Sequence, residues 1–276
     1  MLLEPRDAVW IEDPGYPNLR AVLGAAGGRV VDVPVDAQGL DVEAGLARHP
    51  RPAMMVVTPA CQYPLGVQMS LSRRFALLRA AEACGSWIVE DDFQSDFAQD
   101  VAPIAPIARL DATARTIVVG TFSHVLFPSL RIAWCVLPPP LVPVLDAVRR
   151  QLDDHTHGPW QAVLADFIDE GLLAAHLRRM RALYAARRVA LADACAHRLD
   201  ALVPGRLEGG LSVALMLPTR MRDRAIAGHA GAEGVDVLPL SRYSTSVRVN
   251  GLLLGYAALD ERAIAAGVAR LARVLR

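Results

Sequence analysis

Four side chains with acid, base or anion-binding chemistry stand at the ends of two apolar runs. Asp91 closes the run 87–91, Ser123 and His124 follow the run 116–122, and Arg131 comes seven positions after His124. An apolar, β-branched run predicts a buried strand, and ligands of open α/β sheets bind beyond the carboxyl ends of such strands. Arg suits a bidentate grip on an anion, and His suits proton transfer near neutral pH. Residues 116–131 therefore predict the floor of a binding site.

Several longer phrases of the sequence match one known family. They are WIEDPGYPNLR at 10–20, TPACQYPLGVQMSLSRR at 58–74, WIVEDDFQSDF at 87–97, TIVVGTFSHVLFPSLR at 116–131, LADFIDEG at 164–171 and LLLGYAALDE at 252–261. On these matches the chain resembles the aminotransferase-like domain of MocR/GabR-type bacterial transcription regulators. That domain is a fold-type-I pyridoxal phosphate (PLP) protein. The matches span nearly the whole chain, so the resemblance implies its fold throughout.

The residue that carries the family's covalent chemistry is different here. In the family the loop after the strand contains Gly-Thr-Phe-Ser-Lys, and its lysine holds PLP as a Schiff base; in this sequence that position is His124. The 29 basic residues of the chain are all arginine. A Schiff base needs an unprotonated primary amine, which neither a guanidinium nor an imidazole supplies. Composition therefore excludes transamination that starts from a lysine Schiff base in this chain.

The resemblance assigns cofactor contacts to five further residues. It implies that Asp91 pairs with the protonated pyridine nitrogen, that Tyr16 stacks on the ring, and that Ser123 and Arg131 contact the phosphate. Phe93 stands where the family usually has a tyrosine that bonds the cofactor's phenolic oxygen. Loss of that hydroxyl removes a partner of the oxygen and fits a relaxed demand for catalysis. These residues are our candidate cofactor contacts.

Other interpretations of the same residues stay open at this stage. An acidic run after a strand also caps a turn, Tyr16 lies between two prolines in a turn-forming sequence, and an Arg that begins a strand is often a solvated end residue. Arg242 and Arg248, in LSRYSTSVRVNG, are the candidates for gripping the α-carboxylate of an amino acid, a role that the family gives to an Arg of its small lobe. A solvent-facing loop arginine is the alternative for both.

One further polar group has a spacing that suits a metal ion. It consists of Asp153, Asp154, His155 and His157. Solvated polarity in front of a helix that opens at Pro159 explains this group without a metal. We therefore predict no metal site.

Alternating apolar runs and amphipathic segments predict an α/β fold. Strands buried on both faces are expected at 8–12, 29–35, 53–58, 87–91, 116–122 and 131–137, with helices at 18–26, 42–48 and 70–84. After a Pro-rich connection, helices are expected at 144–152, 159–169 and 172–197, then strands at 212–217, 235–238 and 252–256 with helices at 222–230 and 260–275. This order predicts a large domain with a mostly parallel sheet at 1–140, connecting helices at 141–200 and a smaller α/β domain at 201–276.

Composition limits the partners and the compartment. The 29 acidic and 29 basic residues cancel, so no electrostatic footprint for nucleic acid is expected. The four cysteines form no C-x-x-C pair and no secretory signal opens the chain, which predicts reduced thiols in a cytoplasmic protein. The longest charge-free apolar stretch, 132–145, contains four prolines and is too short to cross a membrane. The resemblance adds a homodimer, because fold-type-I sites lie at a dimer interface.

The resemblance also concerns the start of the chain. Its first strand is expected to begin only about seven residues after Met1, whereas the family's domain begins upstream with a Gly-Ser-Gln-rich turn that holds the cofactor phosphate, preceded by a winged helix-turn-helix domain. We therefore expect an N-terminally truncated large domain.

Three functional hypotheses follow from these observations. The first is a degenerate effector-binding or dimerisation module of a MocR/GabR-type regulator, with PLP or an amino acid as a non-covalent ligand. The second is a PLP-dependent enzyme with altered chemistry that uses His124 as a base. The third is a remnant without independent activity.

Overall fold

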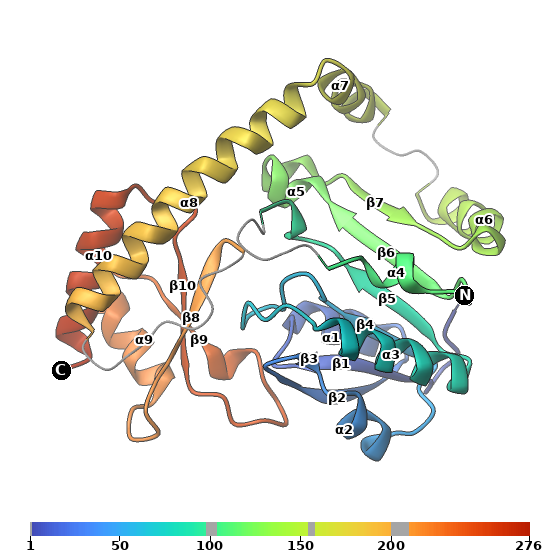
Figure 1. The fold of residues 1–276 in the computed structure, drawn as a ribbon, viewed down its shortest axis with the longest axis horizontal. Coiled ribbons are helices and arrows are strands. Elements are labelled where there is room, and N and C mark those ends of the chain that lie inside the picture. The colour runs from blue at the N-terminus through green and yellow to red at the C-terminus, as the bar shows by residue number, and fades with distance from the viewer. Residues whose placement is uncertain (1, 98–103, 154–157, 200–209) are drawn as a thin grey trace.

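The computed structural model describes residues 2–97, 104–153, 158–199 and 210–276 (Figure 1). It contains a seven-stranded sheet with the order β3-β2-β1-β4-β5-β6-β7 and a three-stranded sheet with the order β8-β10-β9. The first sheet belongs to the large lobe, and the second belongs to a smaller lobe near the C-terminus. The predicted α/β class with a mostly parallel sheet is confirmed.

The large sheet follows the apolar runs of the sequence closely. Its strands are β1 (Ala8–Asp13), β2 (Arg29–Asp36), β3 (Gly39–Leu40), β4 (Met54–Val57), β5 (Trp87–Asp91), β6 (Thr116–Thr121) and β7 (Ala133–Val136). The five central strands are parallel, whereas β3 and β7 pair antiparallel at the two edges. The chain moves outward from β1 to β3 and then returns to β4 on the other side of β1. A topological switch point therefore lies between β1 and β4.

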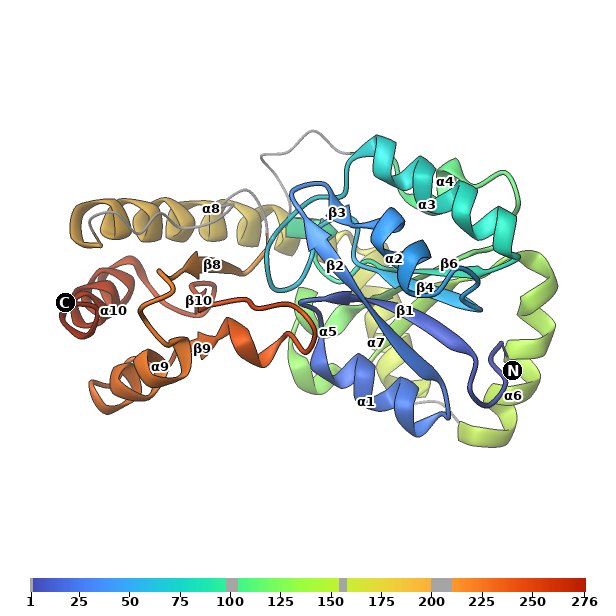
Figure 2. The same cartoon turned by 90° about the horizontal axis from the view of Figure 1, so that it is seen from below.

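Helices cover the large sheet on both faces. Helices α2 (Val42–Arg48), α3 (Leu71–Cys84) and α4 (Ile107–Leu110) lie on one side, and α1 (Pro17–Ala25) lies on the other (Figure 2). Alternate strand residues point to opposite faces, so Trp10 and Met55 pack in the core on the α2 and α3 side while Val9 and Met54 pack toward α1. This alternation explains why the central strands are apolar on both faces.

Local signals in the sequence set the ends of two of these helices. The Asp41 carboxylate accepts a hydrogen bond from Ala44 N (3.1 Å) at the start of α2, and Ser70 Oγ accepts one from Arg73 N (3.2 Å) at the start of α3. Gly85 ends α3 in the left-handed conformation with φ of 70°. These caps satisfy backbone groups that a helix terminus leaves free.

Two expected strands are less buried than predicted: β2 is mostly half-buried, and β7 is exposed along its whole length. Residues 131–137 were predicted as a strand covered on both faces, but all four residues of β7 are exposed, including Trp134 (38%) and Val136 (58%). The reason is position, since β7 is the last strand of the sheet in the described part of the chain and pairs only with β6. An apolar run identifies a strand but does not say whether it lies at the centre or the edge.

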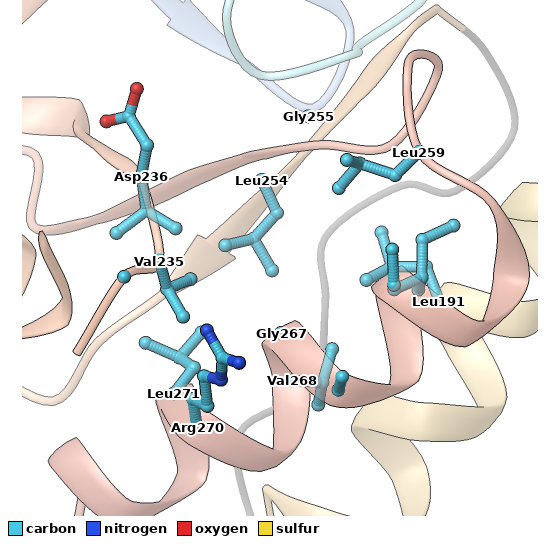
Figure 3. Close-up of a pocket in the computed structure, with 15 residues that line it drawn as sticks. Leu191, Val235, Asp236, Leu254, Gly255, Leu259, Gly267, Val268, Arg270 and Leu271 are labelled. Atoms are coloured by element: carbon cyan, nitrogen blue, oxygen red, sulfur yellow. The ribbon is translucent and has the colours of Figure 1, made fainter.

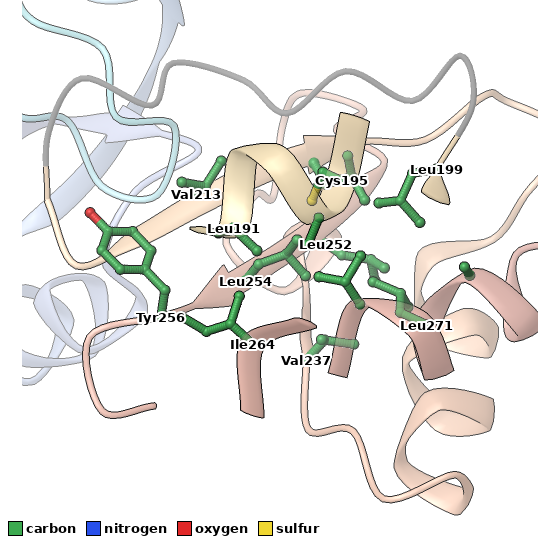
Figure 4. Packing of buried hydrophobic residues seen from close by; sticks show 14 of the residues in the cluster. Leu191, Cys195, Leu199, Val213, Val237, Leu252, Leu254, Tyr256, Ile264 and Leu271 are labelled. Carbon is green, nitrogen blue, oxygen red and sulfur yellow. The ribbon is translucent and has the colours of Figure 1, made fainter. Parts of the chain in front are cut away.

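Three helices connect the two sheets. They are α6 (Val142–Asp153), α7 (Gly158–Asp169) and the long α8 (Leu172–Arg198), which runs from α7 to the small lobe (Figure 1). The small lobe contains β8 (Ser212–Met216), α9 (Asp223–Ala232), β9 (Leu238–Pro239), β10 (Gly251–Gly255) and α10 (Glu261–Val274). Its core joins α8 and α10 to one face of the sheet through Leu191, Cys195, Leu252 and Leu271 (Figure 4).

The strand expected at 235–238 is displaced. The structure has only the two-residue strand β9 at Leu238–Pro239. The backbone of Val235 still bonds to the C-terminal end of α9, because its N–H donates to the carbonyl oxygen of Ala230 (2.8 Å). The first residue of the run 235–238 therefore caps a helix, and only the last residue, Leu238, pairs with β10.

The two lobes meet at the turn after β1. The Asp13 carboxylate accepts hydrogen bonds from the backbone N–H groups of Thr245 (3.2 Å), Ser246 (2.7 Å) and Val247 (3.2 Å) of the small lobe. Gly15 N donates to the carbonyl oxygen of Tyr243 (2.9 Å). These bonds hold the loop 243–247 against the large lobe. Among the residues that the structure describes, no helix is both long and apolar enough to cross a bilayer.

Candidate functional site

A cavity of about 450 Å³ opens at the carboxyl ends of the central parallel strands. Its lining includes Glu12 of β1, Val57 of β4, Asp91 of β5 and Thr121 of β6. Because the switch point lies between β1 and β4, these strand ends diverge and leave a crevice. The cavity is therefore where the topology of the sheet predicts a ligand.

Six residues singled out in the sequence line this one cavity. They are Tyr16, Asp91, Phe93, Ser123, His124 and Arg131. They come from the turn before α1, the end of β5 and the loop after β6, three segments that the parallel sheet brings to one edge. The ring of Tyr16 is 50% exposed at the N-terminus of α1.

Asp91 is an acidic group of the cavity lining that has no described cation or hydrogen-bond donor beside it. Burial, together with the neighbouring Asp92 carboxylate, raises the pKa of Asp91 to about 6. Within the described ranges, no side chain or backbone group donates a hydrogen bond to its carboxylate. A half-buried carboxylate of this kind is stabilised by a cationic or N–H partner. The position therefore favours a ligand that brings a protonated nitrogen.

Ser123 and His124 lie on α5 (Phe122–Val125), the short helix that follows β6. Thr121 Oγ1 accepts a hydrogen bond from Ser123 N (3.1 Å) and caps this helix. The His124 ring packs edge-on against Phe93 with ring centroids 5.7 Å apart. Partial burial lowers the pKa of His124, so the imidazole is neutral at neutral pH and able to accept a proton.

Arg131 supplies the guanidinium of the cavity wall. It ends the 3-10 helix η2 (Pro128–Leu130) with φ of 53°, in the left-handed region that residues other than glycine rarely adopt. Its side chain is exposed, and it forms no ion pair with a described residue. A strained backbone that presents a cation to a cavity is a common feature of binding sites.

An aromatic cluster forms the wall that faces the small lobe. Tyr63 contacts Tyr16, Phe93 and Tyr243 edge-on, at centroid distances of 6.3, 5.9 and 5.2 Å. Its hydroxyl donates to the Tyr243 hydroxyl (3.0 Å), and burial raises its pKa, with the Tyr243 bond adding to the effect. Tyr63 therefore joins the cavity to the small lobe.

Two candidate residues lie elsewhere. Arg242 and Arg248 are exposed on the small lobe and are absent from the described lining of the cavity. Arg242 is still close enough to oppose the rise in the pKa of Tyr63. Of the group with metal-ligand spacing, the side chains of Asp153, Asp154, His155 and His157 lie outside the described residues. Elsewhere in the described ranges, no three His, Cys, Asp or Glu side chains cluster in a way that suits a metal ion.

Glu12 and Tyr63 are among the lining residues of the cavity that were not expected from the sequence. Glu12 sits one residue before the end of a buried strand, a position that parallel strands bring to the shared edge, so its place in the run 8–12 was an available signal. Gly15 supports this turn, because a Cβ there would lie 2.2 Å from the carbonyl oxygen of Glu12. Tyr63 offered no comparable signal, since its loop is placed by tertiary contacts.

A second cavity, of about 460 Å³, lies in the small lobe between α10 and the strand β10 (Figure 3). Leu191, Leu254, Val268 and similar apolar side chains form most of its wall. Asp236 and Arg270 are the ionisable residues of its described lining, and both are exposed. This cavity lacks the convergent polar groups of the first one.

The sequence is similar to a known family and to two bacterial regulators. Residues 1–217 match the sequence model described as aminotransferase class I and II. The chain is 37% identical over 273 residues to the probable rhizopine catabolism regulatory protein MocR of Rhizobium meliloti. This match covers 97% of this chain and 54% of that protein. It is 37% identical over 281 residues to the transcriptional regulator TauR of Rhodobacter capsulatus, with 100% of this chain and 57% of that protein covered. The chain thus spans about half the length of these relatives.

A solved structure extends the comparison to the fold. The α-aminoadipate aminotransferase of Thermus thermophilus, complexed with a phosphopyridoxyl derivative of leucine, superposes with a TM-score of 0.90 at 28% identity. The match covers 99% of this chain and 72% of that chain. Both lobes therefore follow the arrangement of that protein.

Proposed function

The chain belongs to the aminotransferase class I and II family, and on that premise we propose that it is the ligand-binding module of a MocR-type regulator that holds PLP without a covalent bond. The Asp91 carboxylate carries this proposal. It is a half-buried acid with a raised pKa and no described hydrogen-bond donor, on the wall of a cavity that also presents Arg131. A ligand with a protonated ring nitrogen and an anionic group satisfies both.

The residues present fit a pyridine ring with a phosphate. Asp91 would accept a hydrogen bond from the ring nitrogen, Ser123 and Arg131 would bind the phosphate, and Tyr16 would stack on the ring. When bound, PLP supplies an electron-withdrawing ring. The cavity volume of about 450 Å³ is within the range of small-molecule sites.

Two side chains separate this site from a lysine-dependent transaminase. His124 has no primary amine, and no lysine elsewhere in these 276 residues replaces it. Phe93 contributes no hydroxyl to the cavity, and its ring packs between Tyr63 and His124. Stacking, ion pairing and phosphate contacts remain, and these are enough for reversible binding.

A homodimer is part of the proposal. Exposed apolar side chains include Trp134 and Val136 on β7, Val142 and Leu152 on α6, and Trp160 and Val163 on α7. Exposed large apolar side chains of this kind support an interaction face. Sedimentation over a range of concentrations tests it, and a single species of 29.7 kDa at every concentration would refute it.

A second candidate function is catalysis with His124 as the base. Burial lowers the pKa of His124, and this favours the hypothesis because a neutral imidazole is able to take a proton. Loss of deuterium from the α-carbon of an amino acid supplied already condensed with PLP, and abolished in His124→Ala, would support it. Retention of the deuterium in the wild type excludes it.

Equilibrium dialysis with PLP tests the main proposal. The proteins are wild type, Asp91→Asn, His124→Lys and the control Asp166→Asn, whose carboxylate is exposed on α7. We expect saturable binding by wild type and Asp166→Asn and at least about tenfold weaker binding by Asp91→Asn, from the loss of a charge-assisted hydrogen bond. Absence of saturable binding by wild type refutes the proposal.

Borohydride reduction then separates the two binding modes. Because the chain has no lysine, background labelling is confined to the N-terminal amine. We expect peptide mapping to find PLP fixed at position 124 in His124→Lys and no labelled side chain in wild type. A labelled side chain in the wild type contradicts the non-covalent mode.

A further inference from the structure

Glu12 is a carboxyl group on the cavity wall that the cofactor contacts proposed above do not use. It lies near the end of β1 and is only 6% exposed. It lines the same cavity as Asp91, which raises the pKa of Glu12 further, although burial is the larger cause. No described arginine or histidine forms an ion pair with it. A buried carboxyl group without a cation needs another means of holding its charge.

Neutral donors hold this carboxyl group. One oxygen, Oε1, accepts a hydrogen bond from Thr58 N (3.2 Å), and Oε2 accepts bonds from Thr58 Oγ1 and from Gln62 Nε2 (3.2 Å). These bonds favour the ionised form and oppose the effect of burial, and the balance sets the pKa of Glu12 at about 7. Glu12 is therefore divided between two charge states at neutral pH.

The same contacts tolerate the neutral form. A protonated Oε2 is able to donate to Thr58 Oγ1, because a hydroxyl accepts as well as donates. Gln62 Nε2 keeps bonds to the carbonyl oxygens of Pro14 (2.8 Å) and Tyr63 (2.7 Å) when it loses the one to Glu12. A proton therefore enters or leaves without releasing the loop that carries Tyr63.

Two further titratable groups lie near Glu12, in addition to the neutral donors Thr58 and Gln62, and Arg131 is the cation of the same cavity lining. Asp91 approaches from β5, and the Cys61 thiol of the neighbouring loop has a pKa raised to about 11 by burial and by Glu12 itself. A bound ligand displaces water from the wall, which removes solvation from an ionised Glu12. An anionic group on the ligand adds to the effect.

We propose that Glu12 is a proton-coupled positioning residue that becomes protonated when an anionic pyridine ligand fills the cavity. This inference rests on the cofactor site proposed above. It makes ligand affinity depend on pH, because a group whose pKa rises on binding favours the complex below its free pKa. That advantage is lost as the pH rises toward the pKa of the complex.

Calorimetric titration tests the coupling. The probe is pyridoxine phosphate, which lacks the aldehyde and so reports only non-covalent binding. Titrations at pH 6 to 9, in two buffers of different ionisation enthalpy, give both the affinity and the number of protons taken up. The proteins are wild type, Glu12→Gln, Thr58→Val and the control Glu43→Gln, whose carboxylate is exposed on α2.

Each variant has its own expected result. Wild type and Glu43→Gln should take up as much as one proton more than Glu12→Gln near pH 8. Their affinity should fall relative to Glu12→Gln by up to about tenfold for each pH unit above 7. Thr58→Val loses a donor that favours the ionised form, so the onset of this fall should move to higher pH.

The outcomes distinguish this inference from the proposed function. If wild type and Glu12→Gln both bind with the same proton uptake and the same pH profile, the coupling is wrong while the cofactor site stands. If Glu12→Gln does not fold, the test uses Thr58→Val instead. A pH dependence of ligand affinity in Thr58→Val that is identical to that of wild type then overturns the coupling. If wild type binds at no pH, the cofactor site itself is wrong and the coupling falls with it.

Discussion

Glu12→Gln should remove a loss of stability that the ligand-free protein suffers as the pH rises from about 4.5 to about 7. Folding buries Glu12 and raises its pKa from the ordinary 4.5 to about 7. Below 4.5 the carboxyl group is protonated in both states. Between the two values the unfolded chain is ionised while the folded protein keeps the proton, so the folded state is progressively disfavoured. Above 7 both states are ionised and the loss is complete.

The size of this effect follows from the same two values. A pKa difference of about 2.5, at about 1.36 kcal/mol for each unit, corresponds to about 3 kcal/mol of unfolding free energy. That is a substantial share of the stability of a typical domain, which is on the order of 5–15 kcal/mol. The glutamine keeps an oxygen for the Thr58 N–H and carries no charge, so its stability has no such dependence.

Urea denaturation of wild type and Glu12→Gln at pH 4, 5, 6, 7 and 8 measures the effect directly. Asp91, whose pKa is raised to about 6 by burial and by Asp92, contributes a slope of the same sign to both proteins. The difference between the two curves therefore isolates Glu12. We expect this difference to change by about 3 kcal/mol in favour of the variant between pH 4 and pH 8. Parallel curves would refute the assignment of a high pKa to Glu12.

Two further predictions concern the lobes. Asp13→Ala removes the bonds to the backbone of residues 245–247 and should lower stability by about 2–4 kcal/mol at pH 7 in urea denaturation. Burial tends to raise the pKa of Asp13, but hydrogen bonds from Ser246 and Ser244 outweigh burial and lower the pKa below 3.8. The stability difference between wild type and Asp13→Ala should therefore shrink as the pH falls below about 3.8. A difference that is unchanged at pH 3 contradicts this. Arg74→Met leaves the buried Glu90 without its cation (3.8 Å) and removes the bond to the carbonyl oxygens of Met69, Ala105 and Pro59, of which Pro59 O keeps a bond from Met69 N (2.9 Å). We expect a loss of about 3–5 kcal/mol, whereas Arg79→Met, at an exposed position of the same helix, should change stability by less than about 0.5 kcal/mol.

Much of the fold was predictable because the strands are apolar runs, of which β1 and β4 are buried on both faces. The runs at 8–12, 29–35 and 87–91 became β1, β2 and β5 with ends that differ by at most one residue. The two-residue strand β3 has too few residues to show a period, so it was not expected. The exposure of β7 was also missed, because it depends on the neighbours that a strand has in the sheet.

The cavity was predictable in part for a related reason. Asp91 and His124 stand at the ends of apolar runs, and parallel strands bring such ends to one edge. Arg242 and Arg248 were proposed from the role that the resembling family gives to an Arg of its small lobe, and both lie outside the described lining. Tyr63 reaches the cavity through the bonds of Gln62 to Glu12 and Pro14, which join segments about 50 residues apart. No local pattern records such contacts.

The sequence by itself determined which covalent bonds this chain is able to form. These 276 residues contain 29 arginines and no lysine, so none of their side chains supplies a primary amine in any conformation, and position 124 is a histidine. Only the tertiary structure decided the charge of the cavity. Glu12 and Asp91 are ordinary acids in the unfolded chain, and their pKa values rise to about 7 and about 6 mainly because folding removes water from around them. The charge of Asp91 adds to the rise for Glu12, and the charge of Asp92 adds to the rise for Asp91.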